Sequence, residues 1–386
     1  MLATLMIASS ISPLAINIFI PSMTSIARDL GADGATVGLG LSLYLFATAA
    51  IQLIAGPLSD RFGRRPVILG GMALFIFGTL LCLVAENVQL FLAGRVVQAA
   101  SATGIALSRA IVRDLYSREK AASMIGYVTM GLAVAPMLGP ALGGVIDGAV
   151  GWRAVFWLLE GIGVLAFVLF WFDLSETNAE RGKPIASQFG SYGALFSTPN
   201  FWVYVLSSSL TSGVFFAFLG GAPFVAVEVL GMTPAGYGFW FMFCALGYIL
   251  GNFAAGRLSE RLGIKTMMVT GAAVSLSATL LSAAFVLSGW LSAGTLFLPM
   301  LLVGLGNGLA LPSATAGGVS VRPEAAGAAA GILGAFQIGV GAVATMVAAI
   351  LATRGTDGVG LVLLMVAFGV LGFAASLVAR RERKPG

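Results

Sequence analysis

The sequence contains no histidine and few charged residues of either sign. Asp, Glu, Lys and Arg make up 10% of its 386 residues, whereas a soluble domain carries about 25%. Charged side chains cover water-facing surfaces, so this shortage predicts that most of the surface faces lipid. The absence of histidine excludes a histidine metal site, a histidine proton relay and a Ser-His-Asp triad.

Other missing features exclude further classes of protein. The two cysteines, Cys82 and Cys244, lie in apolar runs, so we expect no disulfide framework. No Gly-rich loop ending in Lys-Ser or Lys-Thr is present, which leaves an ion gradient or the solute's own gradient as the energy source. Neither a clustered nucleophile and base nor a filter-like loop is visible, which disfavours an intramembrane enzyme and a channel. We expect no enzymatic activity, no cofactor and no metal.

Long apolar runs fill the chain instead, with a mean hydropathy of +0.98. A bilayer core needs roughly 20 apolar residues per helical span. We predict an all-α membrane protein with twelve transmembrane helices in two pseudo-symmetric six-helix bundles. The first run lacks a basic leader, so we interpret it as a span. The expected spans are 3–27, 36–57, 66–86, 88–112, 121–147, 153–174, 200–227, 237–258, 265–288, 294–316, 326–352 and 358–379.

The basic residues lie mainly in alternate connections between these spans. With the N-terminus inside, the outer loops hold only Arg28, Arg153 and Arg354, and Arg95 lies within a span. The positive-inside rule therefore predicts that both termini are cytoplasmic, in a bacterial-type inner membrane. The pI is near 9.5. Because the basic residues lie between apolar spans, we attribute them to membrane topology and expect no nucleic-acid partner.

A short motif occurs once in each half of the chain. Gly56-Pro57-Leu58-Ser59-Asp60-Arg61-Phe62-Gly63 follows the second span, and Gly256-Arg257-Leu258-Ser259-Glu260-Arg261-Leu262-Gly263 follows the eighth. Two halves related by a pseudo-two-fold axis along the membrane normal produce such a repeat. We predict an N-terminal bundle over 1–175, a cytoplasmic linker over 176–199 and a C-terminal bundle over 200–386.

The first copy of this motif, with Arg64 and Arg65 after it, resembles the signature loop of the major facilitator superfamily. The segment Leu92–Gly104 is similar to that family's fourth-span motif, with Arg95 and Gln98 in place and Ala99 where glycine is usual. The run 131–144 looks like the fifth-span motif of its antiporters, through Gly131, Pro136, Gly139, Pro140, Gly143 and Gly144. Gly151-Trp152-Arg153, Leu174-Ser175-Glu176-Thr177 and Phe216-Ala217-Phe218-Leu219 resemble its drug-exporting branch, which includes the bicyclomycin and chloramphenicol resistance (Bcr/CflA-like) proteins.

The resemblance implies roles for three groups of residues. The signature loop acts in the family as a latch between halves, which here implies Gly56, Asp60, Arg61, Gly63 and Arg64, with Arg109 and Arg113 as natural partners of Asp60. The arginines of this loop act only as topology anchors in the alternative interpretation. The glycines and prolines of 131–144 suit a bent, closely packed helix between the halves, or ordinary small-residue packing.

Two ionisable residues within spans are candidates for coupling. Arg95 lies about two turns into its span, where a cation costs several kcal/mol unless it is paired or hydrated. Gln98 shares its helical face. We expect coupling or substrate binding from Arg95, with a structural arginine bound to backbone carbonyls as the alternative. Glu160 is a candidate proton carrier or a structural hydrogen-bonded acid, and it is a possible internal partner of Arg95.

One residue departs from the drug-exporting branch. Its members often carry an aspartate in the first span just before an Ile/Tyr-Leu-Pro segment, and Asn17 stands in that place. Because asparagine carries no proton at ordinary pH, proton coupling must then use another group, such as Glu160, or be absent.

We predict an alternating-access secondary transporter that exports small hydrophobic or amphipathic compounds by proton antiport, with the proton gradient as its energy source. The alternative is a facilitator or a proton-linked transporter of one metabolite. We expect a monomer in the lipid bilayer with small-molecule substrates and protons as its partners. Aromatic and amide side chains within spans are candidates for an apolar binding pocket: Asn17, Tyr44, Phe215, Phe218, Tyr248, Asn307 and Gln337.

Overall fold

A computed structural model describes residues 1–115, 124, 128, 138–178, 193–322, 325–354 and 358–379. Within these residues the regular structure is entirely helical, and 11 helices are long and apolar enough to cross a membrane. Much of the predicted fifth span lies outside the described residues, and its described end is the shorter apolar helix Leu138–Val150. The predicted all-α membrane fold is confirmed.

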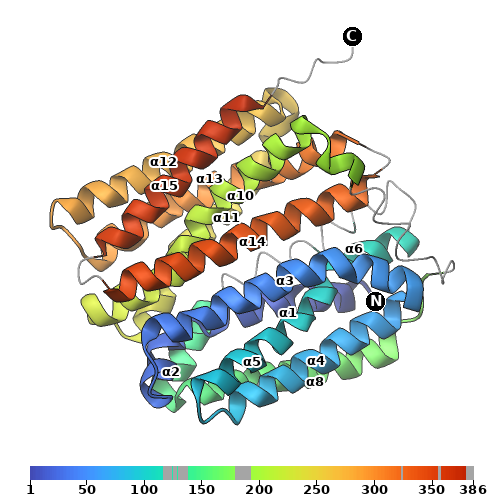
Figure 1. Cartoon of the computed structure of the whole chain (residues 1–386), viewed down its shortest axis with the longest axis horizontal. Coiled ribbons are helices and arrows are strands. Elements are labelled where there is room, and N and C mark those ends of the chain that lie inside the picture. Colours follow the sequence, from blue (N-terminus) through green and yellow to red (C-terminus); the bar gives the residue numbers. More distant parts are fainter. Residues whose placement is uncertain are drawn as a thin grey trace. The chain divides into compact units, whose positions relative to one another are not determined.

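The chain divides into two compact units (Figure 1). The first comprises Met1–Phe189 and Thr233–Phe239, and the second comprises Gly190–Met232 and Trp240–Gly386. The predicted boundaries at 175 and 199 remain predictions.

The helices of the first half of the chain are α1 (Leu2–Ile18), η1 (Ile20–Ser22), α2 (Met23–Asp29), α3 (Gly34–Phe62), α4 (Arg64–Leu83), α5 (Val88–Gln98), η2 (Ala99–Ser101), α6 (Ala102–Leu115), Leu138–Val150 and α8 (Trp152–Asp173). Those of the second half are α10 (Pro199–Phe224), η3 (Val225–Val229), α11 (Pro234–Leu262), α12 (Ile264–Leu287), α13 (Ala293–Ser320), α14 (Ala326–Arg354) and α15 (Val359–Val378).

Proline and local turns explain the breaks within spans. Pro21 lies in the 3₁₀ turn η1, so the first span continues as α1, η1 and α2. The fourth span is broken in the same manner, because the 3₁₀ turn η2 separates α5 from α6. The sequence pattern predicted a span over 88–112, and Val88–Val112 is long and apolar enough to be one.

The two halves repeat each other in detail at α3 and α11, which both have 29 residues. Asp33 caps the start of α3 by accepting a hydrogen bond from the Thr36 N–H (2.8 Å), and Thr233 accepts one from the Gly236 N–H (3.1 Å) at the start of α11. Hydrogen bonds from Thr36 hold the pKa of the Asp33 carboxyl below its usual value.

The ends of these two helices also match. Gly63 (φ 104°) follows α3 and Gly263 (φ 82°) follows α11, and both adopt a left-handed backbone that favours glycine. Beyond them, Arg65 donates to the Trp171 carbonyl (2.7 Å), and Lys265 donates to the Leu377 carbonyl (3.2 Å). The sequence repeat therefore corresponds to a structural repeat.

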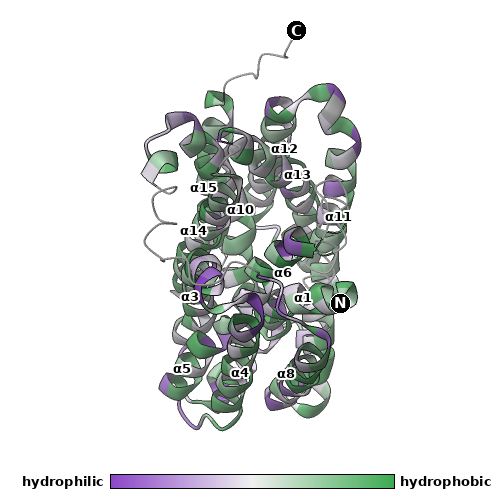
Figure 2. Ribbon diagram, turned by 90° about the vertical axis from the view of Figure 1, so that its right-hand side faces the viewer, coloured by the Kyte–Doolittle hydropathy of each residue, from purple (hydrophilic) through white to green (hydrophobic). Residues whose placement is uncertain are grey.

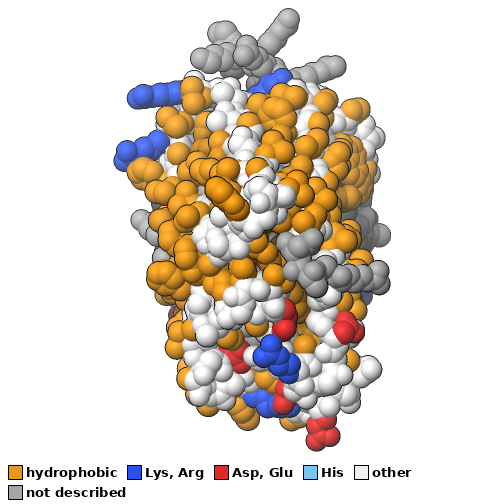
Figure 3. Space-filling model, turned by 90° about the vertical axis from the view of Figure 1, so that its left-hand side faces the viewer, with side chains coloured by type: hydrophobic (Ala, Val, Ile, Leu, Met, Phe, Trp, Pro, Cys, Tyr) orange, Lys and Arg blue, Asp and Glu red, His pale blue; other side chains and the backbone are white. Residues whose placement is uncertain are grey.

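The surface carries many large hydrophobic side chains. Phe172, Leu165 and Trp290 are 82%, 72% and 70% exposed, and hydrophobic residues line most of the helices in Figure 2. On the face shown in Figure 3, hydrophobic side chains cover most of the surface and the visible acidic side chains lie in its lower part. A surface with so many exposed apolar side chains is stable in contact with lipid or detergent and not with water.

Candidate functional site

Arg95 is the centre of a buried polar cluster in the first unit. Its side chain is fully buried (0% exposed) on α5. It donates from Nη1 to the Gln98 Oε1 atom and to the Ala15 carbonyl (3.3 Å), and from Nε to the Gly40 carbonyl (3.4 Å). Gln98 extends the network to α4 by donating from Nε2 to Thr79 Oγ1 (2.9 Å). Helices α1, α3 and α5 thus meet at this one guanidinium, and α4 joins the cluster through Gln98.

Two aromatic rings cover the same guanidinium. The Arg95 Cζ atom lies 4.0 Å from the ring centre of Phe19 and 4.5 Å from that of Tyr44. A desolvated cation–π contact contributes about 2 kcal/mol, which offsets part of the cost of burying a cation in a membrane protein. No carboxylate pairs with Arg95 in the described part of the chain, and its Nη2 atom has no hydrogen-bond partner there. The cluster is therefore a fixed positive charge with unused donor capacity.

Tyr44 extends the cluster through hydroxyl groups. Its Oη atom lies 2.8 Å from Ser101 Oγ and 3.1 Å from Ser12 Oγ. Ser101 lies in the turn η2 and donates to the Gln98 carbonyl (3.2 Å). The break in the fourth span thus places a hydroxyl beside Tyr44 and next to the Arg95–Gln98 pair.

Asn17 lies on α1 where this helix meets the glycine-rich fifth span. Its Nδ2 atom donates to the Pro13 carbonyl (2.8 Å), and its buried Oδ1 atom has no partner among the described residues. A Cβ atom added to Gly139 would lie 3.1 Å from the Asn17 Cβ atom, and one added to Gly143 would lie 1.8 Å from the Ile18 carbonyl oxygen. The glycines thus let the fifth span contact α1 at its backbone.

The rest of the predicted fifth-span motif is only partly visible. Pro140 and Gly144 lie on the helix Leu138–Val150, while Gly131 and Pro136 fall outside the described residues. The contact of this motif with α1 is within the first unit.

Glu160 lies on α8 and is 7% exposed. Its Oε2 atom has no hydrogen-bond partner in the described part of the protein, and no ion pair with Arg95 forms there. The internal pair considered between these residues therefore does not form in the described structure. A buried carboxyl oxygen without a donor is far better tolerated in the protonated form than in the charged form.

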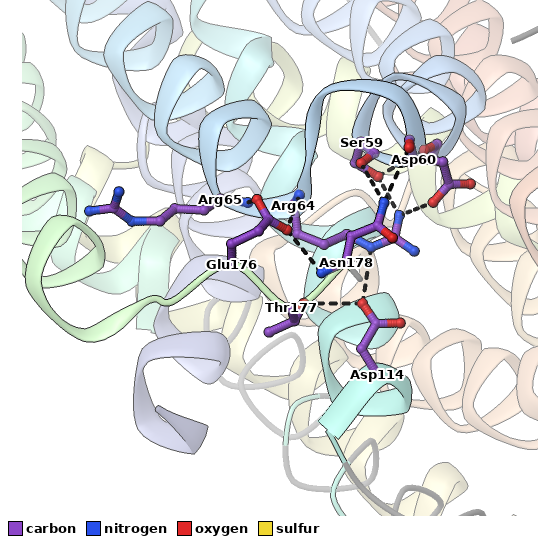
Figure 4. A network of polar contacts seen from close by, with 9 residues as sticks. Ser59, Asp60, Arg64, Arg65, Asp114, Glu176, Thr177 and Asn178 are labelled. Carbon is purple, nitrogen blue, oxygen red and sulfur yellow. Dashed lines mark hydrogen bonds and ion pairs between the residues drawn. The ribbon is translucent and has the colours of Figure 1, made fainter. Parts of the chain in front are cut away.

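The predicted latch loop has its own network at the turn between α3 and α4 (Figure 4). Arg64 forms ion pairs with Asp60, one turn earlier, and with Asp114 on α6 (Nε–Oδ2 3.1 Å). Arg109 lies half-buried on α6, and the side chain of Arg113 lies outside the described residues. Asp60 thus pairs with Arg64 of its own loop.

The segment after α8 binds both sides of this turn. The Glu176 carboxylate accepts hydrogen bonds from the N–H groups of Arg64 (2.9 Å) and Arg65 (3.2 Å), the first two residues of α4. Asn178 Nδ2 donates to the carbonyl oxygens of Ser59 (3.3 Å) and Asp60 (3.2 Å) in the last turn of α3. A carboxylate at a helix N-terminus is stabilised by the helix dipole, so this segment holds the turn in place.

The glycines of the latch loop differ in their surroundings. A Cβ atom on Gly63 would lie 2.3 Å from Glu176 Oε2, so this glycine supplies both space and backbone conformation. A Cβ atom on Gly56 would meet no described atom within 4 Å. Arg61 is exposed, with its guanidinium over the Phe62 ring.

Two of the second unit's candidate residues belong to an aromatic cluster. Phe218 is fully buried, and its ring centre lies 5.4 Å from that of Phe297 and 6.4 Å from that of Phe241. Phe215 joins the same cluster through Phe241 (6.2 Å). Asn307 is buried on α13, where its Oδ1 atom has no partner among the described residues. Tyr248 and Gln337 are half-buried.

Several residues of these sites were not predicted from sequence as site residues. Phe19, Ser101, Asp114 and Asn178 carried no local pattern that assigned them a partner. Glu176 had one usable signal, because it belongs to the motif Leu174–Thr177 at the end of a span. A contact between residues more than 100 positions apart, such as Glu176 with Arg64, requires the three-dimensional arrangement.

Known proteins are similar to this chain in sequence and in fold. The Multidrug resistance protein D of Escherichia coli (strain K12) is 30% identical over 389 residues, which cover 96% of this chain and 93% of that protein. The Chloramphenicol resistance protein of Pseudomonas aeruginosa is 28% identical over 382 residues, covering 97% and 90%. A solved bacterial homologue of the human lysosomal transporter Spinster, in an inward-facing and occupied conformation, has the same fold (TM-score 0.72, 18% identity, 98% and 96% covered).

The sequence profile of the Major Facilitator Superfamily matches residues 5–345. This match spans both units and includes the signature loop, the Arg95 cluster and the glycines that contact α1. The chain is thus a multi-pass membrane protein that acts on small molecules, and it belongs to the Major Facilitator Superfamily.

Proposed function

We propose that this protein exports small hydrophobic or amphipathic compounds from the cytoplasm in exchange for protons, by alternating access. The similarity to proteins named for multidrug and chloramphenicol resistance supports the substrate class. The apolar, aromatic interior of the second unit supports it independently, because such surroundings suit lipophilic, weakly charged compounds.

The buried carboxyl group of Glu160 is the observation that carries the proton coupling. An acid that is 7% exposed, with an oxygen lacking any donor among the described residues, favours its protonated form. A carboxyl that gains and loses a proton as its surroundings open to water is suited to couple proton movement to transport. Asn17 carries no proton, so Glu160 takes this role.

Arg95 is proposed as a coupling and binding residue. Its unused Nη2 donor offers a hydrogen bond to a substrate or to a carboxylate that forms during the cycle. The latch residues Asp60 and Arg64, held by Glu176, are proposed to stabilise one state of the cycle.

We also propose the cellular setting. The predominance of basic residues in the predicted inner connections supports a bacterial inner membrane location with both termini in the cytoplasm. The protein is proposed to work as a monomer, without nucleic acid, cofactor or enzymatic activity.

The test uses purified protein in liposomes that contain a pH-sensitive dye. Chloramphenicol and rhodamine 6G are added across an imposed pH gradient. Drug-dependent proton flux that is lost in Glu160→Gln or Arg95→Ala is the expected result. Drug movement without proton flux would contradict antiport and leave a facilitator, with Asn17 as the simplest reason. Saturable transport of a single metabolite, with neither drug moved, would contradict multidrug export.

A further inference from the structure

A second buried acid lies in the first unit, at the end of the fifth span. Asp147 is 8% exposed and lies one turn before Gly151, whose N–H donates to the Asp147 carbonyl (2.9 Å). Its Oδ2 atom accepts a hydrogen bond from Ser25 Oγ on α2 (2.8 Å). The sequence pattern placed this residue at the edge of a span and gave it no role.

The charged groups around Asp147 are engaged elsewhere or exposed. Asp29, four residues after Ser25 on α2, is paired with Arg153 and accepts a hydrogen bond from Trp152 Nε1 (3.2 Å). Arg28 on the same helix is exposed. In the described part of the chain, no lysine or arginine forms an ion pair with Asp147.

A carboxylate in such a place lacks a compensating cation. The hydroxyls of Ser25 on α2 (2.8 Å) and of Ser22, just before this helix, replace only part of the water that a charged carboxylate loses on burial. The protonated form needs far less compensation. The group can therefore take up a proton at a small cost. Its position one turn from the helix end puts it near the water at the Asp29–Arg153 end of the unit.

We propose that Asp147 is a second proton-carrying residue, which exchanges its proton with the water on the outer side while Ser25 orients its carboxyl group. A proton from water binds a carboxylate oxygen to give the carboxylic acid, and the same O–H bond breaks when the proton moves on. No other bond changes. This inference rests on the proposed antiport and adds a proton entry site to it, separate from Glu160 on α8.

The test compares two transport modes of Asp147→Asn in liposomes. Uphill transport couples chloramphenicol to proton flux, whereas exchange with chloramphenicol at equal concentration on both sides needs no net proton movement. We expect a loss of drug-dependent proton flux of more than tenfold, with exchange within twofold of the unchanged protein. Unchanged proton flux in Asp147→Asn would overturn the proposal.

Further variants separate a proton role from a structural one. Asp147→Glu retains a carboxyl group and is expected to recover proton flux, and Ser25→Ala is expected to lower flux severalfold with exchange intact. Asp33→Asn changes an exposed acid at a helix start and is expected to alter neither mode. Equal loss of flux and exchange in Asp147→Asn and Asp147→Glu would show a structural role and overturn the proposal. Absence of proton flux in the unchanged protein would instead refute the proposed antiport itself.

Discussion

The two units share a scaffold but differ in their buried chemistry. Each has a helix that ends at a left-handed glycine, followed by a basic residue bound to the carbonyl of a later helix. Among the described residues, however, the buried charged side chains are Arg95, Asp147 and Glu160, all in the first unit. The buried polar residues described in the second unit are serines, threonines and Asn307, beside an aromatic cluster.

This difference suggests a division of labour on one repeated framework. A buried ionisable group is costly in a membrane protein and is retained where it has a function. The scaffold alone therefore does not determine function, and the side chains placed on it do. We assign proton coupling to the first unit and an apolar binding surface to the second.

The largest effect is expected from removing the charge at the centre of the buried polar cluster. Arg95→Leu leaves Gln98 Oε1 without the Arg95 donor and removes the additional hydrogen bonds to the Ala15 and Gly40 carbonyls. The buried Gln98 oxygen then costs about 1–3 kcal/mol of stability. Because the variant also removes the proposed coupling residue, we expect export to fall by more than about tenfold, which corresponds to about 1.4 kcal/mol. Chloramphenicol efflux from cells, corrected for protein amount, measures this.

Arg95→Lys serves as the matched variant. It keeps the charge but loses the planar group that contacts both rings, so export intermediate between the unchanged protein and Arg95→Leu is expected. Full export by Arg95→Leu would remove the basis for assigning coupling to this cluster.

A large effect of another kind is expected in the second unit. Phe218→Ala removes a fully buried ring from the aromatic cluster, and such truncations cost roughly 3–5 kcal/mol. We expect a lower unfolding temperature and weaker drug binding, with the ratio of protons to drug unchanged. Thermal unfolding in detergent and flux in liposomes measure the two quantities. Leu280→Ala, at a position 50% exposed, is the control and should change neither. A changed ratio of protons to drug in Phe218→Ala would contradict the assignment of proton coupling to the first unit alone.

A smaller effect distinguishes the two turns. Gly63→Ala and Gly263→Ala both place a side chain in left-handed backbone, which costs about 1–2 kcal/mol. Only Gly63 also contacts Glu176, so its substitution disturbs two further hydrogen bonds worth about 1 kcal/mol each. We expect Gly63→Ala to lower the unfolding temperature more than Gly263→Ala. Equal decreases in unfolding temperature would mean that the hydrogen bonds of Glu176 do not stabilise the turn.

The smallest effect concerns the helix caps at Asp33 and Thr233. Asp33→Ala and Thr233→Ala each remove a cap worth about 1 kcal/mol. Hydrogen bonds lower the pKa of Asp33 from 3.8, so its extra stabilisation is present above that pH and is lost as the pH falls through the lowered pKa. The difference in unfolding temperature between Asp33→Ala and the unchanged protein should therefore be smaller at pH 3 than at pH 7. The difference for Thr233→Ala should not depend on pH.

The sequence was sufficient to predict the helices, their order and the repeat, because apolar period and length determine spans directly. It also placed Gln98 on the helical face of Arg95, since residues three apart share a face, but it did not predict the hydrogen bond between them. The break at Ala99–Ser101 and the contacts of Glu176 depend on packing between helices, which no local pattern encodes. Asp147 was passed over because it lies at a span edge, where its 8% exposure could not be foreseen.

Proton flux in two variants tests the division of labour most directly. Glu160→Gln with Asp147→Asn removes the two buried acids among the described residues of the first unit, whereas Glu228→Gln changes an exposed acid of the second. Both proteins are placed in dye-loaded liposomes and given chloramphenicol. We predict that the double variant loses drug-dependent proton flux and keeps drug exchange, while Glu228→Gln retains both. Proton flux that persists in the double variant, or disappears in Glu228→Gln, would contradict it.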